Sequence, residues 1–183
     1  MKGTVMNRIM IILLVGLFSL SCGVDKSAED LFSQAESLRK SKDIKGSLDQ
    51  LELLISKYPK HALAAKSQYM LGDIYMNDLR DFQQAIQAYQ QVVERFPGSD
   101  QEAQAQFMIG YIYANILANY ELATQSYKTF LDKFPDHELA PSVRFELEYL
   151  GKDINDIPVL KQITSHALPS GTPGGINTAT PRS

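Results

Sequence analysis

The chain has 183 residues, of which 44% are hydrophobic and 21% are charged, a composition that suits a globular domain and excludes wholesale disorder. Its 18 basic and 21 acidic residues give a net charge of −3, and the absence of a dense run of Lys or Arg argues against a nucleic-acid partner. The single cysteine, Cys22, excludes an internal disulfide framework and a cysteine-rich metal site.

Residues 1–21 have the layout of a secretory signal peptide. Lys2 and Arg8 give a positive start, and an apolar run follows from Ile9 to Leu20. This run is shorter than the roughly 20 apolar residues that a bilayer-spanning helix needs, and the chain turns polar at Asp25. We therefore expect export rather than a permanent transmembrane anchor.

Cys22 lies where signal cleavage is expected, directly after the small residue Ser21. The segment resembles the cleavage site of bacterial lipoproteins, in which the cysteine thiol is acylated and becomes the new N-terminus. The resemblance implies a covalent lipid on Cys22, no other cofactor, and a short lipidated linker over residues 22–26. Gly23 is similar to the following residue of lipoproteins sorted to the outer membrane, facing the periplasm. The alternative is an ordinary signal peptide in which Cys22 is incidental.

The middle of the chain repeats with a period of 38 residues. The aromatic–proline pairs Tyr58-Pro59, Phe96-Pro97 and Phe134-Pro135 show this spacing. In each repeat, apolar residues recur at helical spacing on either side of a polar stretch, which predicts two antiparallel helices. Each proline is expected to end the second helix, because proline cannot continue it. The three repeats are expected at about 27–60, 61–98 and 99–136.

The second and third repeats carry a known signature: an apolar–Gly pair, a Tyr, an Ala, a second Tyr and a closing Pro. The signature residues are Leu71, Gly72, Tyr75, Ala85, Tyr89 and Pro97 in the second repeat, and Ile109, Gly110, Tyr113, Ala123, Tyr127 and Pro135 in the third. They resemble the tetratricopeptide repeat. The first repeat is a weaker match, in which Gln34 and Ser47 replace the usual Leu and Ala. The resemblance implies an all-α, right-handed superhelical solenoid of about three helix-turn-helix repeats plus a C-terminal capping helix.

Two details of packing follow from the signature. Each glycine is expected to leave room for the alanine of the second helix in the same repeat. The second and third repeats run from Gly to Pro in 25 residues, where the tetratricopeptide family usually takes 24. We therefore expect a one-residue insertion in the turn after Asn77 and after Asn115.

Beyond the last repeat, one apolar stripe that ends at Gly151 predicts a further helix, with Pro141 in a first turn, where proline is tolerated. Such a helix would cover the apolar face left by the last repeat. The residues after His166 are dominated by Pro, Gly, Ser and Thr, which favours a flexible tail. The expected segments are a capping helix at 137–151, a short element at 157–163 within a repeat domain of 27–165, and a disordered tail at 166–183.

The sequence contains no catalytic or metal-binding pattern. The histidines His61, His137 and His166 are scattered, and no His-Glu-x-x-His pair is present to hold zinc. No Gly-x-Ser-x-Gly elbow occurs, and the residues near Asp153 lack the Gly and Glu of a calcium loop. We therefore expect a protein that has no metal site, is not an enzyme and acts by binding.

The tetratricopeptide resemblance implies a partner-binding concave face lined by first-helix positions. These positions are Glu29, Phe32, Glu36 and Arg39 in the first repeat, Lys66, Tyr69, Asp73 and Met76 in the second, and Gln104, Phe107, Tyr111 and Asn115 in the third. Phe32, Tyr69 and Phe107 occupy the same place in successive repeats. They are expected either to form an aromatic ladder that a peptide contacts or to pack between adjacent first helices.

Two envelope functions fit a lipid-anchored chain of this kind. It resembles the outer-membrane β-barrel assembly lipoproteins of the BamD type, which scaffold a barrel-insertion complex from the periplasmic side. It is also similar to periplasmic tetratricopeptide proteins linked to Tol-Pal and cell-wall coordination. We expect a scaffold that binds other envelope proteins or peptides through its groove and the membrane through its lipid. A glycan-binding or enzyme-accessory lipoprotein is the alternative from another class.

Overall fold

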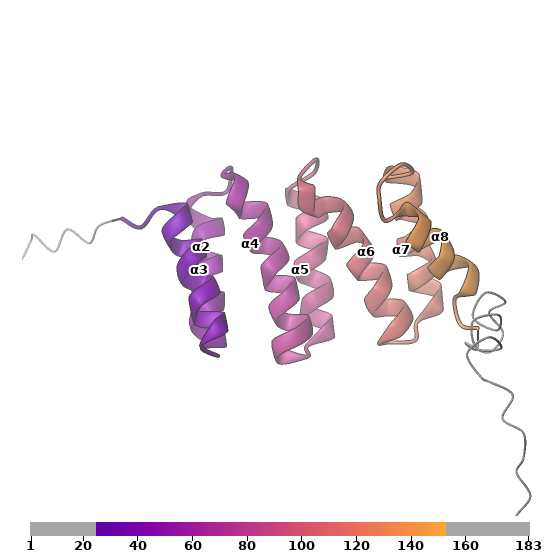
Figure 1. The fold of residues 1–183 in the computed structure, drawn as a ribbon, viewed down its shortest axis with the longest axis horizontal. Helices are drawn as coiled ribbons and strands as arrows, with labels where there is room; N and C mark the ends of the chain where they lie inside the picture. The colour runs from indigo at the N-terminus through magenta and orange to yellow at the C-terminus, as the bar shows by residue number, and fades with distance from the viewer. Residues whose placement is uncertain (1–24, 153–183) are drawn as a thin grey trace, which may run out of the picture. The chain divides into compact units, whose positions relative to one another are not determined.

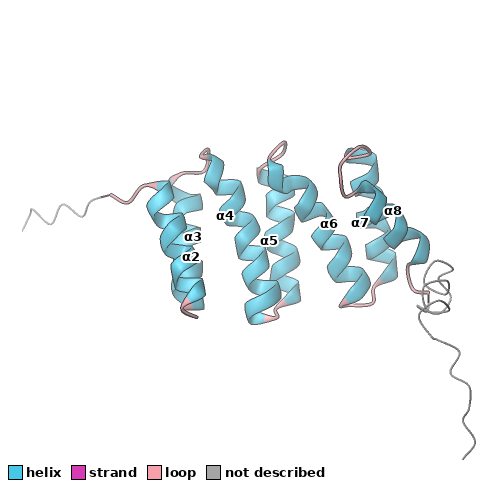
Figure 2. Ribbon diagram, in the orientation of Figure 1, coloured by secondary structure: helices cyan, strands magenta, loops and turns pink. Residues whose placement is uncertain are grey.

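The computed structural model describes residues 25–152, which form seven α-helices and one π-helical turn, with no strand in that range. The elements are α2 (Ala28–Lys40), α3 (Ile44–Lys57), α4 (Ala62–Asp73), the π-helical turn η1 (Ile74–Leu79), α5 (Phe82–Arg95), α6 (Asp100–Asn115), α7 (Tyr120–Lys133) and α8 (Ala140–Tyr149) (Figure 1). Figure 2 shows helix along nearly all of this stretch. The predicted all-α fold class is confirmed.

Several predicted segments lie outside the described residues. They are the signal peptide at 1–21, the lipidation site Cys22, the short element at 157–163 and the tail at 166–183. Of the expected linker at 22–26, only Asp25 and Lys26 are described.

The described chain forms two compact units that divide between Glu102 and Ala103. In the first unit α2 packs against α3, α3 against α4 and α4 against α5, so neighbours in sequence are neighbours in space (Figure 1). In the second unit α7 packs against α8. Helix α6 begins in the first unit and ends in the second.

Each compact unit has its own apolar core. In the first, Leu31, Leu51 and Ile74 are fully buried in one cluster that draws on α2, α3 and the π-helical turn. In the second, Phe130 of α7 and Val143 of α8 are fully buried together. Helix α8 therefore covers the apolar face of α7, within the segment expected to cap the repeats.

The turn inside every repeat has the same geometry. A left-handed residue ends the first helix, and an Asp or Asn then caps the second helix by accepting a backbone N–H three residues on. The left-handed residues are Lys42 (φ 69°), Arg80 (φ 56°) and Ala118 (φ 49°). The capping residues are Asp43, Asp81 and Asn119. Both sets are spaced by 38 residues, so the sequence period is also a period of backbone geometry.

The one-residue insertion lies at the end of the first helix. In each repeat the N–H of the capping residue donates to a first-helix carbonyl, which is five residues earlier in the first repeat and six residues earlier in the other two. These bonds are Asp43 to Leu38 (2.9 Å), Asp81 to Tyr75 (2.8 Å) and Asn119 to Tyr113 (2.8 Å). In the second repeat the extra residue widens the last turn into η1. The insertion expected after Asn77 is thus within a π-helical turn that contains Asn77.

The second helix of each repeat stops at the aromatic residue before the proline. The C-cap residues Tyr58, Phe96 and Phe134 share φ values between −126° and −131° and ψ values between 51° and 54°, which lie outside the helical region that a following proline disfavours. Two of the histidines then accept a backbone N–H two residues on, and His61 thereby caps α4. Nδ1 of His61 accepts the N–H of Leu63 at 3.2 Å, and Nδ1 of His137 accepts the N–H of Leu139 at 3.1 Å. His166 lies outside the described residues.

Each signature glycine lies against a tyrosine ring rather than against the alanine that we expected. A Cβ at Gly72 would be 2.5 Å from Cε1 of Tyr89. A Cβ at Gly110 would be 2.5 Å from Cδ1 of Tyr127. Both tyrosines are fully buried, so neither ring has free space into which it could move. The glycines therefore set the distance between the two helices of a repeat through an aromatic ring.

The other signature residues fall into three classes of exposure. Leu71 and the alanines Ala85 and Ala123 are buried. Tyr75 and Tyr113 are half-buried, and the closing prolines Pro97 and Pro135 are exposed.

The first repeat satisfies the same constraint with different residues. Ala35 takes the place of the glycine and Leu51 the place of the tyrosine, and both are fully buried. Ser47, which replaces the usual alanine, is also fully buried, and its Oγ donates to the carbonyl of Ala35 at 2.8 Å. Because this hydroxyl is hydrogen-bonded, its burial carries little penalty.

Gly72→Ala should lower the free energy of unfolding. Overlap with the Tyr89 ring should cost about 2–3 kcal/mol, more than the roughly 1 kcal/mol that alanine gains over glycine within a helix. Adding Tyr89→Leu copies the Ala35–Leu51 pair of the first repeat, so the double variant should lose less stability than the sum of the single variants. Urea denaturation followed by circular dichroism measures all three. Strictly additive losses would show that the two residues are not in contact.

Candidate functional site

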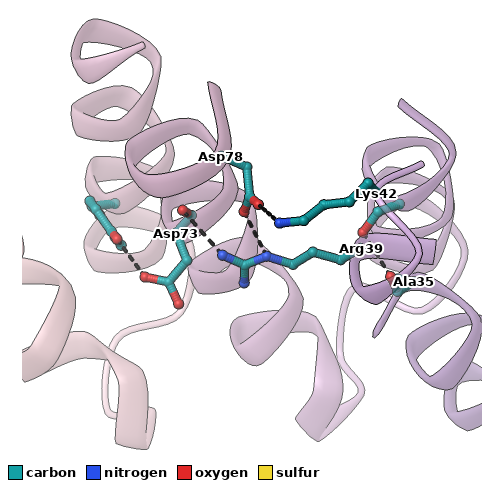
Figure 3. Close-up of polar contacts among 7 residues, drawn as sticks. Ala35, Arg39, Lys42, Asp73 and Asp78 are labelled. Atoms are coloured by element: carbon teal, nitrogen blue, oxygen red, sulfur yellow. Dashed lines mark hydrogen bonds and ion pairs between the residues drawn. The ribbon is translucent and has the colours of Figure 1, made fainter. Parts of the chain in front are cut away.

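Arg39, at the end of α2, joins the first repeat to the second. Its Nε donates to Oδ2 of Asp78 at 2.8 Å, and its Nη2 lies 3.5 Å from the backbone carbonyl of Asp73 (Figure 3). Nζ of Lys42 lies 3.7 Å from the other oxygen of Asp78. The Asp78 side chain is only 12% exposed, so solvent screens this cluster less than an open surface pair. The predicted partner-binding residue Arg39 therefore has a structural partner.

Asp73 is also engaged within the fold. Its Oδ1 accepts a hydrogen bond from the Tyr89 hydroxyl at 2.7 Å. Burial raises the pKa of the Asp73 carboxyl, an effect that the Tyr89 bond and the charge of Arg39 oppose. Burial, and then the charge of Asp73, raises the pKa of Tyr69 to about 12, so this phenol stays neutral at physiological pH. The rings of Tyr69 and Tyr89 are 5.2 Å apart, which places both tyrosines and the carboxyl in one cluster.

Phe32 is a core residue rather than an open partner contact. Its side chain is only 6% exposed, and Nζ of Lys66 lies 4.7 Å from the centre of its ring. Of the two alternatives expected for Phe32, this burial supports packing between helices. Glu29 is exposed, with Oε1 3.1 Å from Nε2 of His61. The remaining predicted residues of this compact unit are Glu36, which is exposed, and Met76, which is half-buried.

In the second compact unit, two predicted aromatic residues gather around Tyr127. The ring of Phe107 stacks with that of Tyr127 at 6.2 Å and lies 6.2 Å from that of Tyr111. Tyr111 stands one period after Asp73, so the carboxylate that accepts the tyrosine hydroxyl in the second repeat has no equivalent in the third. The Tyr127 hydroxyl accordingly has no hydrogen-bond partner among the described residues. Of the other two predicted residues, Gln104 is half-buried and Asn115 is exposed.

A hydrogen bond that the sequence pattern did not predict recurs in both glycine-containing repeats. Nε2 of Gln68 donates to the carbonyl of Ala88 at 3.2 Å, and Nε2 of Gln106 donates to that of Ser126 at 3.1 Å. The two glutamines are 3% and 7% exposed. Each bond joins the first helix of its repeat to the second. The available signal was that a polar residue recurs at a 38-residue spacing on an otherwise apolar helix face.

A groove of about 430 Å³ lies between α3, α4 and α5, and no predicted partner-binding residue is among those that line it. Its buried floor is formed by Ile55, Gln68, Leu71 and Ala88. Its exposed rim carries Gln84, Gln87, Gln91 and Arg95 from α5 and Glu52 and Ser56 from α3. The four α5 residues follow helical spacing along one face of the helix. From sequence alone, such a polar face is typical of a helix surface exposed to solvent, and only the position of α3 in the fold makes it one wall of a groove.

The described residues include neither a candidate metal-binding group of side chains nor a candidate membrane-spanning helix. Between residues 25 and 152, no group of three or more His, Cys, Asp or Glu side chains is placed to hold a metal ion. Among the helices of the same stretch, none combines the length and the hydropathy that crossing a bilayer requires.

Asp78→Ala should reduce the free energy of unfolding by about 1–2 kcal/mol, because it leaves Arg39 without its shielded partner. The loss should shrink in high salt. Asp49→Ala is the matched control: Asp49 pairs with Lys45 at 2.9 Å, but its side chain is 55% exposed, so the change should be much smaller. Thermal denaturation at low and high ionic strength compares the two. Equal losses of stability in the two variants would mean that the Arg39–Asp78 pair stabilises the fold no more than an exposed ion pair does.

Comparison with known proteins agrees with the repeat geometry. A family model described as tetratricopeptide repeat matches residues 31–61, 66–99 and 104–137, more than half of the chain and all three repeats. A comparison with curated proteins found no match. Tetratricopeptide repeats are a protein-interaction fold that is generally non-catalytic. The matched segments and the glycine–tyrosine contacts place this chain in the tetratricopeptide repeat family.

Proposed function

We propose that this protein is a lipid-anchored scaffold of the bacterial cell envelope that binds other proteins through its tetratricopeptide repeats. The observation that carries the proposal is the combination of these repeats with an exported-type N-terminus whose single cysteine, Cys22, directly precedes them. A lipid on Cys22 would fix the protein to a membrane, and the repeats supply the binding surface. No covalent chemistry by the protein itself is needed for this role.

The distance between the anchor and the repeats supports a membrane-proximal scaffold. Nζ of Lys57 pairs with Asp25, and the Tyr58 hydroxyl donates to the carbonyl of Lys26 at 2.7 Å. The chain is thus held against the first repeat from residue 25 onward. Three peptide steps separate Cys22 from Asp25, a reach of roughly 10 Å. A lipid at Cys22 would therefore keep the first repeat close to the bilayer.

Within the envelope we propose a role in outer-membrane assembly, of the kind that BamD-type lipoproteins have. The short reach from lipid to repeats supports this choice over a Tol-Pal and cell-wall coordination protein. Proteins of the latter type usually carry an N-terminal coiled coil, and α2 begins at Ala28, which leaves no room for one after Cys22. Gly23, rather than Asp, next to the lipidated position supports the outer membrane as the site.

Cys22→Ser should abolish lipidation, because the acyl chains attach to the cysteine thiol. The protein should then leave the membrane fraction, or accumulate with its N-terminal segment uncleaved. Mass spectrometry of the intact protein and membrane fractionation measure both effects. Unchanged mass and fractionation in the variant would remove the lipid anchor from the proposal.

Purification of the full-length protein from detergent-extracted membranes, after brief crosslinking, should recover subunits of a barrel-assembly complex. The matched sample is the Cys22→Ser protein, which should recover fewer of them because it is no longer concentrated at the membrane. Quantitative mass spectrometry identifies the partners. Recovery of Tol-Pal or wall-synthesis proteins alone would contradict the assembly role, and recovery of wall fragments without protein would favour the glycan-binding alternative.

A further inference from the structure

We propose that the groove between α3, α4 and α5 binds an extended polypeptide segment of a partner protein. This inference rests on the proposed function, because it gives the scaffold a specific peptide-binding site. The groove lies entirely within the first compact unit and contains none of the first-helix positions that the family resemblance assigns to partners. What it could bind must therefore be judged from its own residues.

The floor of the groove presents a hydrogen-bond acceptor. Gln68 is 3% exposed, and its Nε2 is fixed as the donor to the Ala88 carbonyl at 3.2 Å, because a carbonyl can only accept. The Oε1 of Gln68 accordingly faces away from that bond, and no described residue donates to it. This amide oxygen is open to the groove rather than sealed in the core, so it can accept a hydrogen bond from an N–H or O–H donor that binds there. The backbone N–H of a bound chain supplies such a donor.

The rim matches the hydrogen-bonding groups of a main chain. Gln84, Gln87 and Gln91 are exposed, and their side chains form no hydrogen bonds within the part of the chain that the structure describes. Each carboxamide offers both a donor and an acceptor, as each peptide group does. From Gln84 to Arg95 the α5 wall extends roughly 16 Å at 1.5 Å per residue, which equals about five residues of extended chain at 3.3 Å each.

The charges of the rim select against other ligands. Glu52 and Arg95 stand on opposite walls, and neither forms an ion pair among residues 25–152. One acid and one base give no net charge to attract a phosphate or an anionic lipid surface. They instead fit a peptide that carries one basic and one acidic side chain. The apolar part of the lining consists of the buried residues Ile55, Leu71 and Ala88 and the half-buried ring of Tyr75.

The test uses full-length protein from membranes and a phage-displayed library of random linear heptapeptides as the probe. Selection should enrich peptides with one basic and one acidic residue, and synthetic copies should bind at least tenfold more weakly to Gln87→Arg. Gln90→Arg is the matched control: Gln90 is exposed on the same helix but does not line the groove, so its affinity should be unchanged. Fluorescence polarisation gives the dissociation constants.

Three outcomes would overturn the proposal: no enrichment, peptides that bind both variants equally, or binding of wall glycan fragments that Gln87→Arg removes. The partner recovery described above separates this proposal from the scaffold function. If Gln87→Arg retains the same membrane partners as the unchanged protein, and the peptides show no groove dependence, the scaffold stands and the groove site falls. If the unchanged protein recovers no partner at all, the scaffold function itself falls.

Discussion

In the second and third repeats, the close approach of the two helices depends on one contact, the ring of a buried tyrosine against a glycine. Gly72 admits the Tyr89 ring to a distance that no side chain would allow, and this places the Tyr89 hydroxyl 2.7 Å from Asp73. The backbone carbonyl of Asp73 and the side chain of Asp78 then hold Arg39 of the preceding repeat. Packing inside the second repeat and its attachment to the first are thus parts of one network, in which the buried polar groups find partners.

The sequence predicted the fold because helix-ending residues and hydrophobic periodicity can be recognised within a short stretch of chain. The aromatic–proline pairs mark the helix ends, and the signature residues identify the repeat without any knowledge of contacts. Which side chains meet across two helices is not local. Spacing placed Gly72 and Ala85 on facing helices but could not reveal that the ring of Tyr89 would occupy the space beside the glycine. For the same reason, the extra residue was visible as a count but not as a π-helical turn.

The candidate sites were harder to predict, for two physical reasons. First-helix positions such as Phe32, Arg39 and Asp73 are polar or aromatic enough to suggest a binding surface, yet contacts within a repeat or between adjacent repeats bury or pair them. The groove was missed because its walls come from Glu52 and Gln87, which lie far apart in the chain and have no unusual composition. A helix face that is exposed to solvent and a helix face that forms one wall of a groove have the same polar sequence pattern. Only the position of the opposite helix distinguishes them.

The second and third repeats differ in whether the buried tyrosine hydroxyl has an acceptor. In the second repeat Asp73 accepts from Tyr89, whereas in the third Tyr111 stands in that place and Tyr127 keeps a fully buried hydroxyl without a protein partner. An unpaired buried hydroxyl costs about 1–3 kcal/mol, so the third repeat holds its helices together less favourably than the second. Near Asp25, the Tyr58 hydroxyl fastens the Lys26 carbonyl to the first repeat. Helix α3 contributes both to this contact, through Lys57 and Asp25, and to the groove wall, through Glu52 and Ser56. In the proposed lipid-anchored scaffold, α3 would therefore connect the segment that follows Cys22 to the groove.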